Sequence, residues 1–167
     1  MNAILCADNN WAIGYRGKLL CHLKEDMIFF RGCTLGKTVV MGRKTLESLP
    51  GGRPLKDRRN IVLTRNEDYE APEGVEVVHS LEELEQIVDV ESPDVFSIGG
   101  AEIYAQLFKY YKNVYVTKVY RAFEADRYFR DLDVDDDFRV VEQSKIREEN
   151  GLRYRFLIYE KKESEQQ

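Results

Sequence analysis

Short apolar runs rich in β-branched residues alternate along the chain with longer stretches in which apolar residues recur every three or four positions. The first pattern predicts strands and the second predicts amphipathic helices. We expect strands at residues 3–7, 38–41, 60–63, 75–78, 95–98, 114–119, 138–146 and 153–160. We expect helices at residues 24–32, 43–48, 81–88 and 101–110. This alternation predicts a single α/β domain whose mixed, mostly parallel twisted sheet has about eight strands and helices on both faces.

Two local signals mark where elements begin and turn. Ser80 stands before Leu81, and Glu83 follows three residues later, which is the capping-box pattern of a helix start. Glu149-Asn150-Gly151 lies between the last two expected strands and favours a tight hairpin. The sheet should therefore end in a C-terminal antiparallel hairpin, and the polar segment 161–167 should fray.

The composition is that of an ordinary globular protein. Hydrophobic residues make up 43% and charged residues 33% of the 167 residues, which predicts one domain over residues 1–167. The formal net charge of −5 argues against general binding to nucleic acid or to an acidic membrane surface. No apolar run reaches the about 18 residues of a transmembrane helix, and residues 1–8 lack the basic start of a signal peptide. We expect a monomer without nucleic-acid or membrane partners.

Cysteine and histidine usage limits the redox and metal chemistry. Cys6, Cys21 and Cys33 form no CxxC pair and are odd in number, which is typical of reduced thiols in the cytoplasm. His22 and His79 are too few for a His-rich metal site. We expect a cytoplasmic protein that binds no metal.

One acidic residue lies on an apolar helix face. The residues that share a face with Asp26, at spacings of three, four and seven, are Leu23, Phe29, Phe30 and Cys33. Asp26 is either a helix-start acid stabilised by the helix dipole or a carboxylate in an apolar pocket with a raised pKa. In the second interpretation, aromatic side chains and Met27 form walls for a flat ligand.

Three expected strands end in residues suited to phosphate. Met41-Gly42 leads into Arg43-Lys44-Thr45, and Ile98-Gly99-Gly100 leads into Ala101-Glu102. Each is a strand, then glycine, then a helix N-terminus, where free backbone N–H groups favour an anion. Leu63 is likewise followed by Thr64-Arg65. Because ligands of open α/β sheets gather at the carboxyl ends of strands, the three ends together indicate a nucleotide-like anion. The chain has no GxGxxG motif of the common Rossmann type.

The combination of motifs resembles one family. The motifs stand in the order seen in bacterial dihydrofolate reductases and are Ala12-Ile13-Gly14, Glu25-Asp26-Met27 with Phe30, Met41-Gly42-Arg43-Lys44-Thr45, Arg53-Pro54-Leu55 with Arg58-Arg59-Asn60, Ile98-Gly99-Gly100-Ala101-Glu102-Ile103-Tyr104, Thr117 and Glu124-Ala125-Asp126. The resemblance runs from about residue 3 to residue 160. As a combination it is highly specific, although each motif alone is weak.

The resemblance implies NADPH-dependent reduction of 7,8-dihydrofolate to 5,6,7,8-tetrahydrofolate, with hydride transfer to C6 and protonation at N5, in one-carbon metabolism. It implies that Asp26 binds the 2-amino and N3 edge of the pterin, with Thr117 hydrogen-bonded beside it. Tyr104 completes the implied catalytic set and contacts the pterin or nicotinamide. Antifolates of the diaminopyrimidine type are implied ligands.

The other implied site residues form two sets. The substrate set, which encloses the pterin and benzoyl rings and takes the glutamate carboxylate, is Ile4, Cys6, Asp26, Met27, Phe30, Leu49, Leu55, Arg58 and Ile98. The cofactor set is Cys6, Ile13, Gly14, Gly42, Arg43, Lys44, Thr45, Leu63, Thr64, Arg65, Gly99, Gly100, Ala101, Glu102, Ile103 and Tyr104. In these sets Arg58 has the guanidinium fork that fits a carboxylate, and Gly99-Gly100 resembles the family's cis peptide bond.

The chain departs from most relatives in three places. Leu20-Cys21 stands where Pro-Trp is common, Lys24 where proline is common, and Arg127 where threonine is common. Cys21 is interpreted as a small apolar filler of the pocket. The segment 9–22, rich in Asn and Gly, fits the mobile loop that closes over the nicotinamide in this family.

Three alternatives remain at this stage. A related pterin or pyrimidine reductase could use the same NADPH frame, although a substrate without a glutamate tail does not need Arg58. A noncatalytic nucleotide-binding module explains the glycine–helix ends but not Asp26. A cysteine-dependent enzyme using Cys21 beside His22 lacks an evident orienting acid.

Overall fold

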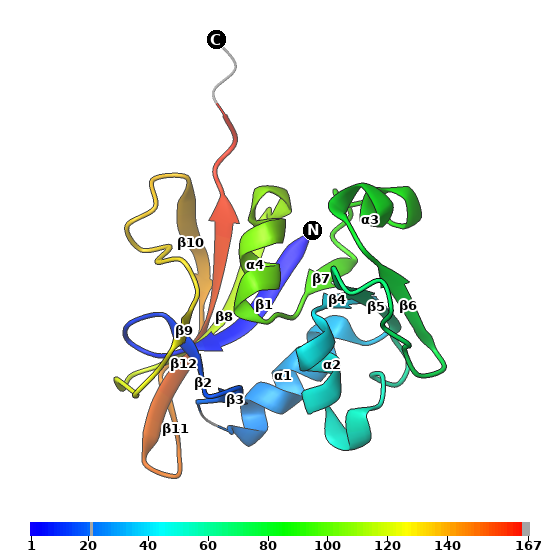
Figure 1. Ribbon diagram of the computed structural model, residues 1–167. Helices are drawn as coiled ribbons and strands as arrows, with labels where there is room; N and C mark the ends of the chain where they lie inside the picture. The colour runs from blue at the N-terminus through cyan, green and yellow to red at the C-terminus, as the bar shows by residue number, and fades with distance from the viewer. Residues whose placement is uncertain (21, 165–167) are drawn as a thin grey trace.

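A computed structural model describes residues 1–20 and 22–164 (Figure 1). In this part of the chain the main sheet has nine strands in the order β10-β12-β8-β1-β7-β4-β5-β6, with β11 paired to β12. Their bounds are β1 (Asn2–Ala7), β4 (Thr38–Met41), β5 (Arg59–Leu63), β6 (Val75–Val78), β7 (Val95–Ser97), β8 (Asn113–Val119), β10 (Phe138–Gln143), β11 (Arg147–Glu149) and β12 (Leu152–Lys161). Figure 1 shows β6 and β10 at opposite ends of the sheet.

The sheet is mixed and mostly parallel, as predicted. The neighbours from β8 through β1, β7, β4 and β5 to β6 all pair in parallel. β12 pairs antiparallel with β8, and β10 and β11 pair antiparallel with β12. The helices are α1 (Lys24–Thr34), α2 (Arg43–Ser48), α3 (Leu81–Ile87) and α4 (Ala101–Leu107), with the short 3-10 helices η1 (Pro50–Gly52) and η2 (Phe108–Tyr110). None of these helices is long and apolar enough to span a membrane.

Side chains that alternate along the strands divide the core into two layers. On one face, Ala3 and Leu5 of β1 pack in a cluster that includes Leu84 of α3 and Leu107 of α4. On the other face, Ile4 belongs to a cluster whose helix residues are Leu46 of α2 and Phe29, Phe30 and Cys33 of α1. The expectation of helices on both faces is therefore confirmed.

The C-terminal hairpin forms at the predicted turn. Glu149 pairs with Leu152, and the residues between them, Asn150 and Gly151, have positive φ angles of 51° and 78°, as a type I′ turn requires. The strand expected at 138–146 is too long, because β10 ends at Gln143 and the next strand, β11, begins only at Arg147.

The division between β10 and β11 has a local cause. Ser144 uses its hydroxyl oxygen to accept the Phe156 N–H at 2.9 Å, while its own N–H donates to the Phe156 carbonyl at 2.8 Å. A side-chain bond thus replaces one bond of the ladder. At the other end β12 runs through Lys161, and the Lys162 N–H donates to the Asp137 carbonyl at 2.7 Å. The chain therefore stays paired beyond the point where fraying was expected.

A second, small antiparallel sheet was not predicted. It consists of β3 (Lys18–Leu19), β2 (Ala12–Tyr15) and β9 (Arg127–Tyr128), in the order β3-β2-β9. Arg16 and Gly17 join β2 to β3 with φ angles of 48° and 76°. Within the segment 9–22, which fits the family's mobile loop, residues 12–19 therefore form a hairpin, and this hairpin pairs with β9 from far along the sequence. Cys21, interpreted above as an apolar filler, lies outside the described residues.

The start of α1 is capped from the C-terminal hairpin. Leu23 precedes α1 in an extended conformation (φ −112°, ψ 126°) and gives no side-chain cap. Glu149 instead accepts the Lys24 N–H with its two carboxylate oxygens at 2.9 and 3.1 Å. This carboxylate satisfies one of the first N–H groups of α1 and faces the positive end of the helix dipole. The bond ties the hairpin to the helix that carries Asp26.

Candidate active site

Asp26 projects from α1 toward the sheet. The Thr117 hydroxyl, in the middle of β8 and 1% exposed, donates to Asp26 Oδ1 at 2.5 Å. Phe29, three residues later on α1, packs against Phe156 of β12 with ring centroids 4.5 Å apart. The carboxylate is therefore held against the sheet by a helix that is packed on the same side, rather than facing solvent at a helix start.

The environment of Asp26 favours its protonated form. Burial raises the pKa of Asp26, and the hydrogen bond from Thr117 opposes this shift by stabilising the carboxylate. Burial is the larger of the two effects. A carboxyl group with a raised pKa beside a cavity is suited to proton chemistry near neutral pH.

A pocket opens beside Asp26, between the end of β1 and the small sheet. Its lining residues are Cys6, Ala7, Asp8, Ala12, Ile13, Leu19, Leu20, Asp26, Val119 and Phe123. The fold thus brings together Asp26, Cys6 of the substrate and cofactor sets, and Ile13 of the cofactor set. Asp8 and Phe123 were not predicted. The available signal for Asp8 was an aspartate directly after a strand, followed by two asparagines.

The expected ring-binding residues form one apolar wall on the α1 and α2 face. The members of the substrate set in the same core cluster are Ile4, Phe30, Leu49, Leu55 and Ile98. Met27 differs, because its side chain is 66% exposed on α1. The wall lies on the same face of the sheet as Asp26, so a flat ligand bound by the carboxylate would lie along it.

Glycines bring the ends of β4 and β7 together. The Gly42 N–H donates to the Gly99 carbonyl at 2.8 Å, and the Gly99–Gly100 peptide bond is cis. A Cβ atom on Gly99, whose φ is 103°, would lie 2.9 Å from Cε2 of Tyr104. Only glycine leaves room for this ring, whose hydroxyl donates to the Ile4 carbonyl at 2.8 Å. Tyr104 therefore links α4 to β1 and packs against the glycine that follows β7.

The expected phosphate-binding residues lie at neighbouring strand ends. β4 and β5 pair in parallel with Met41 opposite Val62, so Gly42 to Thr45 and Thr64-Arg65 follow adjacent strands. Arg43 pairs with Glu47 at 2.9 Å, and Arg65 and Lys44 are exposed. Two members of the cofactor set, Leu63 and Ile103, direct their side chains into the core, at 5% and 6% exposure. Gly14, Gly100, Ala101 and Glu102 flank these strand ends and the pocket.

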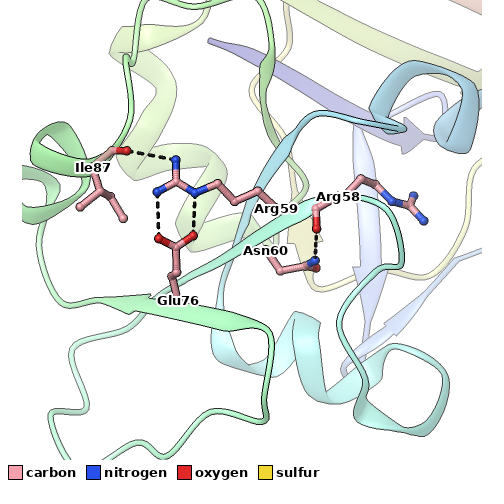
Figure 2. A network of polar contacts seen from close by, with 5 residues as sticks. All are labelled: Arg58, Arg59, Asn60, Glu76 and Ile87. Carbon is pink, nitrogen blue, oxygen red and sulfur yellow. Dashed lines mark hydrogen bonds and ion pairs between the residues drawn. The ribbon is translucent and has the colours of Figure 1, made fainter.

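Arg58 and Arg59 point in opposite directions (Figure 2). Arg59 forms a bidentate pair with Glu76 at 2.6 and 2.8 Å. Arg58 instead donates to the Thr34 hydroxyl at 3.1 Å, at the end of α1. Burial lowers the pKa of Arg58, and the charge of Arg31 lowers it further. The positive charges of Arg58 and Arg31 thus repel one another, and an added carboxylate between them would be favourable.

Among residues 1–20 and 22–164, no group of three His, Cys, Asp or Glu side chains could hold a metal ion.

Comparison with known proteins gives one consistent result. A family model described as dihydrofolate reductase matches residues 1–161. The dihydrofolate reductase of Bacillus subtilis (strain 168) is 41% identical over 163 residues, covering 96% of this chain and 94% of that protein. That of Neisseria gonorrhoeae is 39% identical over 155 residues, covering 92% and 93%. A solved structure of Enterococcus faecalis dihydrofolate reductase complexed with NADP(H) and RAB-propyl has a TM-score of 0.83 and 32% identity, covering 97% of this chain and 96% of that one. The chain belongs to the dihydrofolate reductase family.

Proposed function

We propose that the protein reduces 7,8-dihydrofolate to 5,6,7,8-tetrahydrofolate with NADPH, and that Asp26 is its proton-directing residue. The observation that carries this proposal is the carboxylate of Asp26, which is half-buried on an apolar helix face, accepts a hydrogen bond from Thr117 and lies beside a pocket at the end of β1. Membership of the family supports the same reaction.

Asp26 and Thr117 have the chemistry to bind a pterin edge. A carboxylate accepts several hydrogen bonds, so Asp26 can hold a 2-amino group and an N3–H group while Thr117 occupies a further lone pair. Two parallel N–H donors on one carboxylate fix the ring in its plane. The raised pKa of Asp26 lowers the cost of sharing a proton with the ring. These two residues therefore orient the substrate and promote protonation at N5.

The strand ends fit NADPH. Gly42 and Gly99 keep the backbone of two strand ends in contact, and a Cβ atom on Gly42 would lie 3.1 Å from Cγ1 of Ile103. A side chain at Gly42 or Gly99 would push neighbouring side chains aside, so glycine is needed here, as it is where a ligand approaches the backbone closely. Arg43, Lys44, Thr45, Thr64 and Arg65 would hold the phosphates. Bound NADPH supplies the hydride that the protein itself lacks.

The pocket walls contribute orientation and water exclusion. Ile13 of β2 and Leu19 of β3 place apolar side chains over the pocket that Asp26 lines. Exclusion of water strengthens the hydrogen bonds inside and holds the reacting atoms together. The small sheet is therefore the part of the fold that covers the reaction.

Arg58 distinguishes folate from a smaller pterin. Among residues 1–20 and 22–164, no carboxylate oxygen lies within 4.0 Å of the Arg58 guanidinium, and Arg31 adds like charge nearby. A carboxylate of a bound ligand could supply the anionic partner for Arg58 and Arg31. A glutamate tail supplies it, whereas a pterin or pyrimidine without a tail does not.

The near-ultraviolet absorbance of NADPH tests this proposal. Absorbance should fall when NADPH and dihydrofolate are both present, and should stay constant with NADPH alone. A dihydropterin without the glutamate tail serves as the second substrate. Faster turnover of this pterin than of dihydrofolate would replace the proposal with a pterin reductase.

We further propose that the protein is a cytoplasmic monomer. An odd number of cysteines without a CxxC pair supports a reducing compartment. Cell fractionation and light scattering test the two parts of this proposal.

A further inference from the structure

Asp8 places a carboxylate in the interior at the end of β1. The residue is 1% exposed and lines the same pocket as Asp26. A buried charge is costly unless hydrogen bonds compensate it. Asp8 is therefore expected to have a specific structural task next to the site.

Both oxygens of Asp8 accept backbone N–H groups. Oδ1 accepts from Asn10 at 2.8 Å and from Ala12 at 2.9 Å. Oδ2 accepts from Phe123 at 2.8 Å, across 115 positions of sequence. Other aspartates of the chain, such as Asp89, accept an N–H two residues ahead at an exposed turn. Asp8 differs because it joins its own turn to a distant segment.

The turn that Asp8 holds has an unusual backbone. Trp11 has a φ of 60°, which is uncommon for a bulky side chain. Its ring is 2% exposed and lies 4.1 Å from the ammonium group of Lys118, and the Trp11 N–H donates to the Asp8 carbonyl at 3.1 Å. The conformation is thus fixed by several contacts, and it delivers the chain into β2.

The segments joined by Asp8 are two walls of the active-site pocket. Ala12 and Ile13 at the start of β2 form one wall, and Phe123, before β9, belongs to the other. Figure 1 shows β2 beside the end of β1, and β2 in turn pairs with β9. One carboxylate therefore sets the distance between the walls.

We propose that Asp8 is a positioning residue that sets the width of the pocket for the nicotinamide ring. The inference rests on the function proposed above, because it assigns the nicotinamide to the pocket lined by Cys6 and Ile13. Hydride transfer depends steeply on the distance between donor and acceptor, and a displacement of about 1 Å can cost about a hundredfold in rate. Asp8 touches neither reacting atom and acts through the backbone.

The Asp8→Asn variant should keep the hydrogen bonds to the local turn and lose the one to Phe123. The amide oxygen can still accept from Asn10 and Ala12, but the amide nitrogen faces the Phe123 N–H, and two donors do not bond. Asp8→Ser is the second variant, because a hydroxyl caps the local turn without reaching Phe123. If Asp8→Asn does not fold, Asp8→Ser is used in its place. Asp89→Asn is the matched control, since its bond is local and remote from the pocket.

Amide hydrogen exchange measures whether the hydrogen bond from the Phe123 N–H to Asp8 is present. The Phe123 amide should exchange at least about tenfold faster in Asp8→Asn than in wild type or in Asp89→Asn, while the Ala12 amide stays protected. Unchanged exchange at Phe123 would overturn the assignment of the bond. This readout requires no activity.

Single-turnover kinetics with saturating NADPH and dihydrofolate measures the hydride-transfer rate, which depends on how the pocket positions the nicotinamide. The hydride-transfer rate should fall about tenfold in Asp8→Asn and stay within about twofold in Asp89→Asn, at a temperature where both variants are folded. A wild-type rate in Asp8→Asn, together with faster Phe123 exchange, would make Asp8 a purely structural residue and refute the proposal. Wild type that does not oxidise NADPH would instead refute the proposed function.

Discussion

Replacing Asp26 with asparagine should stabilise the protein while it slows catalysis. Burial raises the pKa of Asp26, so the folded state binds this proton more tightly than the unfolded chain does. The stabilising contribution is present below the ordinary pKa of 3.8 and is lost as the pH rises through the raised value. Above the raised pKa the wild type therefore carries a carboxylate that the fold disfavours, and the Asp26→Asn variant does not.

Two effects on the stability of the Asp26→Asn variant oppose each other. Each unit by which the pKa is raised corresponds to about 1.4 kcal/mol in favour of the neutral side chain. The Thr117 hydroxyl, which lies 2.5 Å from Oδ1, can also donate to an amide oxygen, so the variant loses only the extra strength of a charged acceptor, about 1 kcal/mol. Because burial is the larger of the two effects, we expect Asp26→Asn to have a higher free energy of unfolding than wild type at about pH 8.

Urea unfolding of both proteins between about pH 5 and pH 8 measures this difference. The gain in the free energy of unfolding should shrink as the pH falls, because wild-type Asp26 becomes protonated. Turnover of dihydrofolate by the variant should drop by at least about a hundredfold. A variant less stable than wild type at the upper pH would refute the claim that burial dominates the environment of Asp26.

Three other tests address the cations and the start of α1. Replacing Arg43 and Arg65 together with Ala should weaken NADPH at least about tenfold more than NADH in calorimetry, since only NADPH carries a 2′-phosphate; equal losses would make both residues ordinary surface charges. Arg58→Lys keeps the charge but loses the fork, so folate should bind at least about tenfold more weakly and NADPH should be unaffected; unchanged folate affinity would move the tail contact elsewhere. Glu149→Ala should lower the free energy of unfolding by about 1 kcal/mol, but not in a Lys24→Pro background, where no N–H remains to be capped; an equal loss in both backgrounds would refute the cap.

The parts of the fold with a strong local pattern could be predicted from sequence. The strands at 38–41 and 75–78 have the predicted bounds, because apolar runs of strand length are read within the run itself. The Asn150-Gly151 turn is likewise local, since both residues tolerate positive φ. Asp26 could be singled out because an acid on an apolar helix face violates the helical pattern.

The parts that depend on distant partners could not be predicted. β3 and β9 have two residues each and are stable only through pairing with β2, so neither leaves a pattern of its own. The same holds for Asp8, whose partner Phe123 is 115 positions away. The Arg43–Glu47 pair is different, because its i,i+4 spacing is visible in the sequence and shows that a candidate phosphate ligand already has a neighbouring carboxylate.

Isotope transfer from NADPH to the product shows whether the protein moves a hydride from the cofactor to dihydrofolate. The protein is incubated with dihydrofolate and NADPH that carries deuterium at the transferable position of C4, and the product is analysed by mass spectrometry. Hydride transfer should give one deuterium at C6 of tetrahydrofolate, no solvent hydrogen at that position, and a solvent proton at N5. Oxidation of NADPH without labelled tetrahydrofolate, or label that appears in the solvent, would contradict hydride transfer in this pocket.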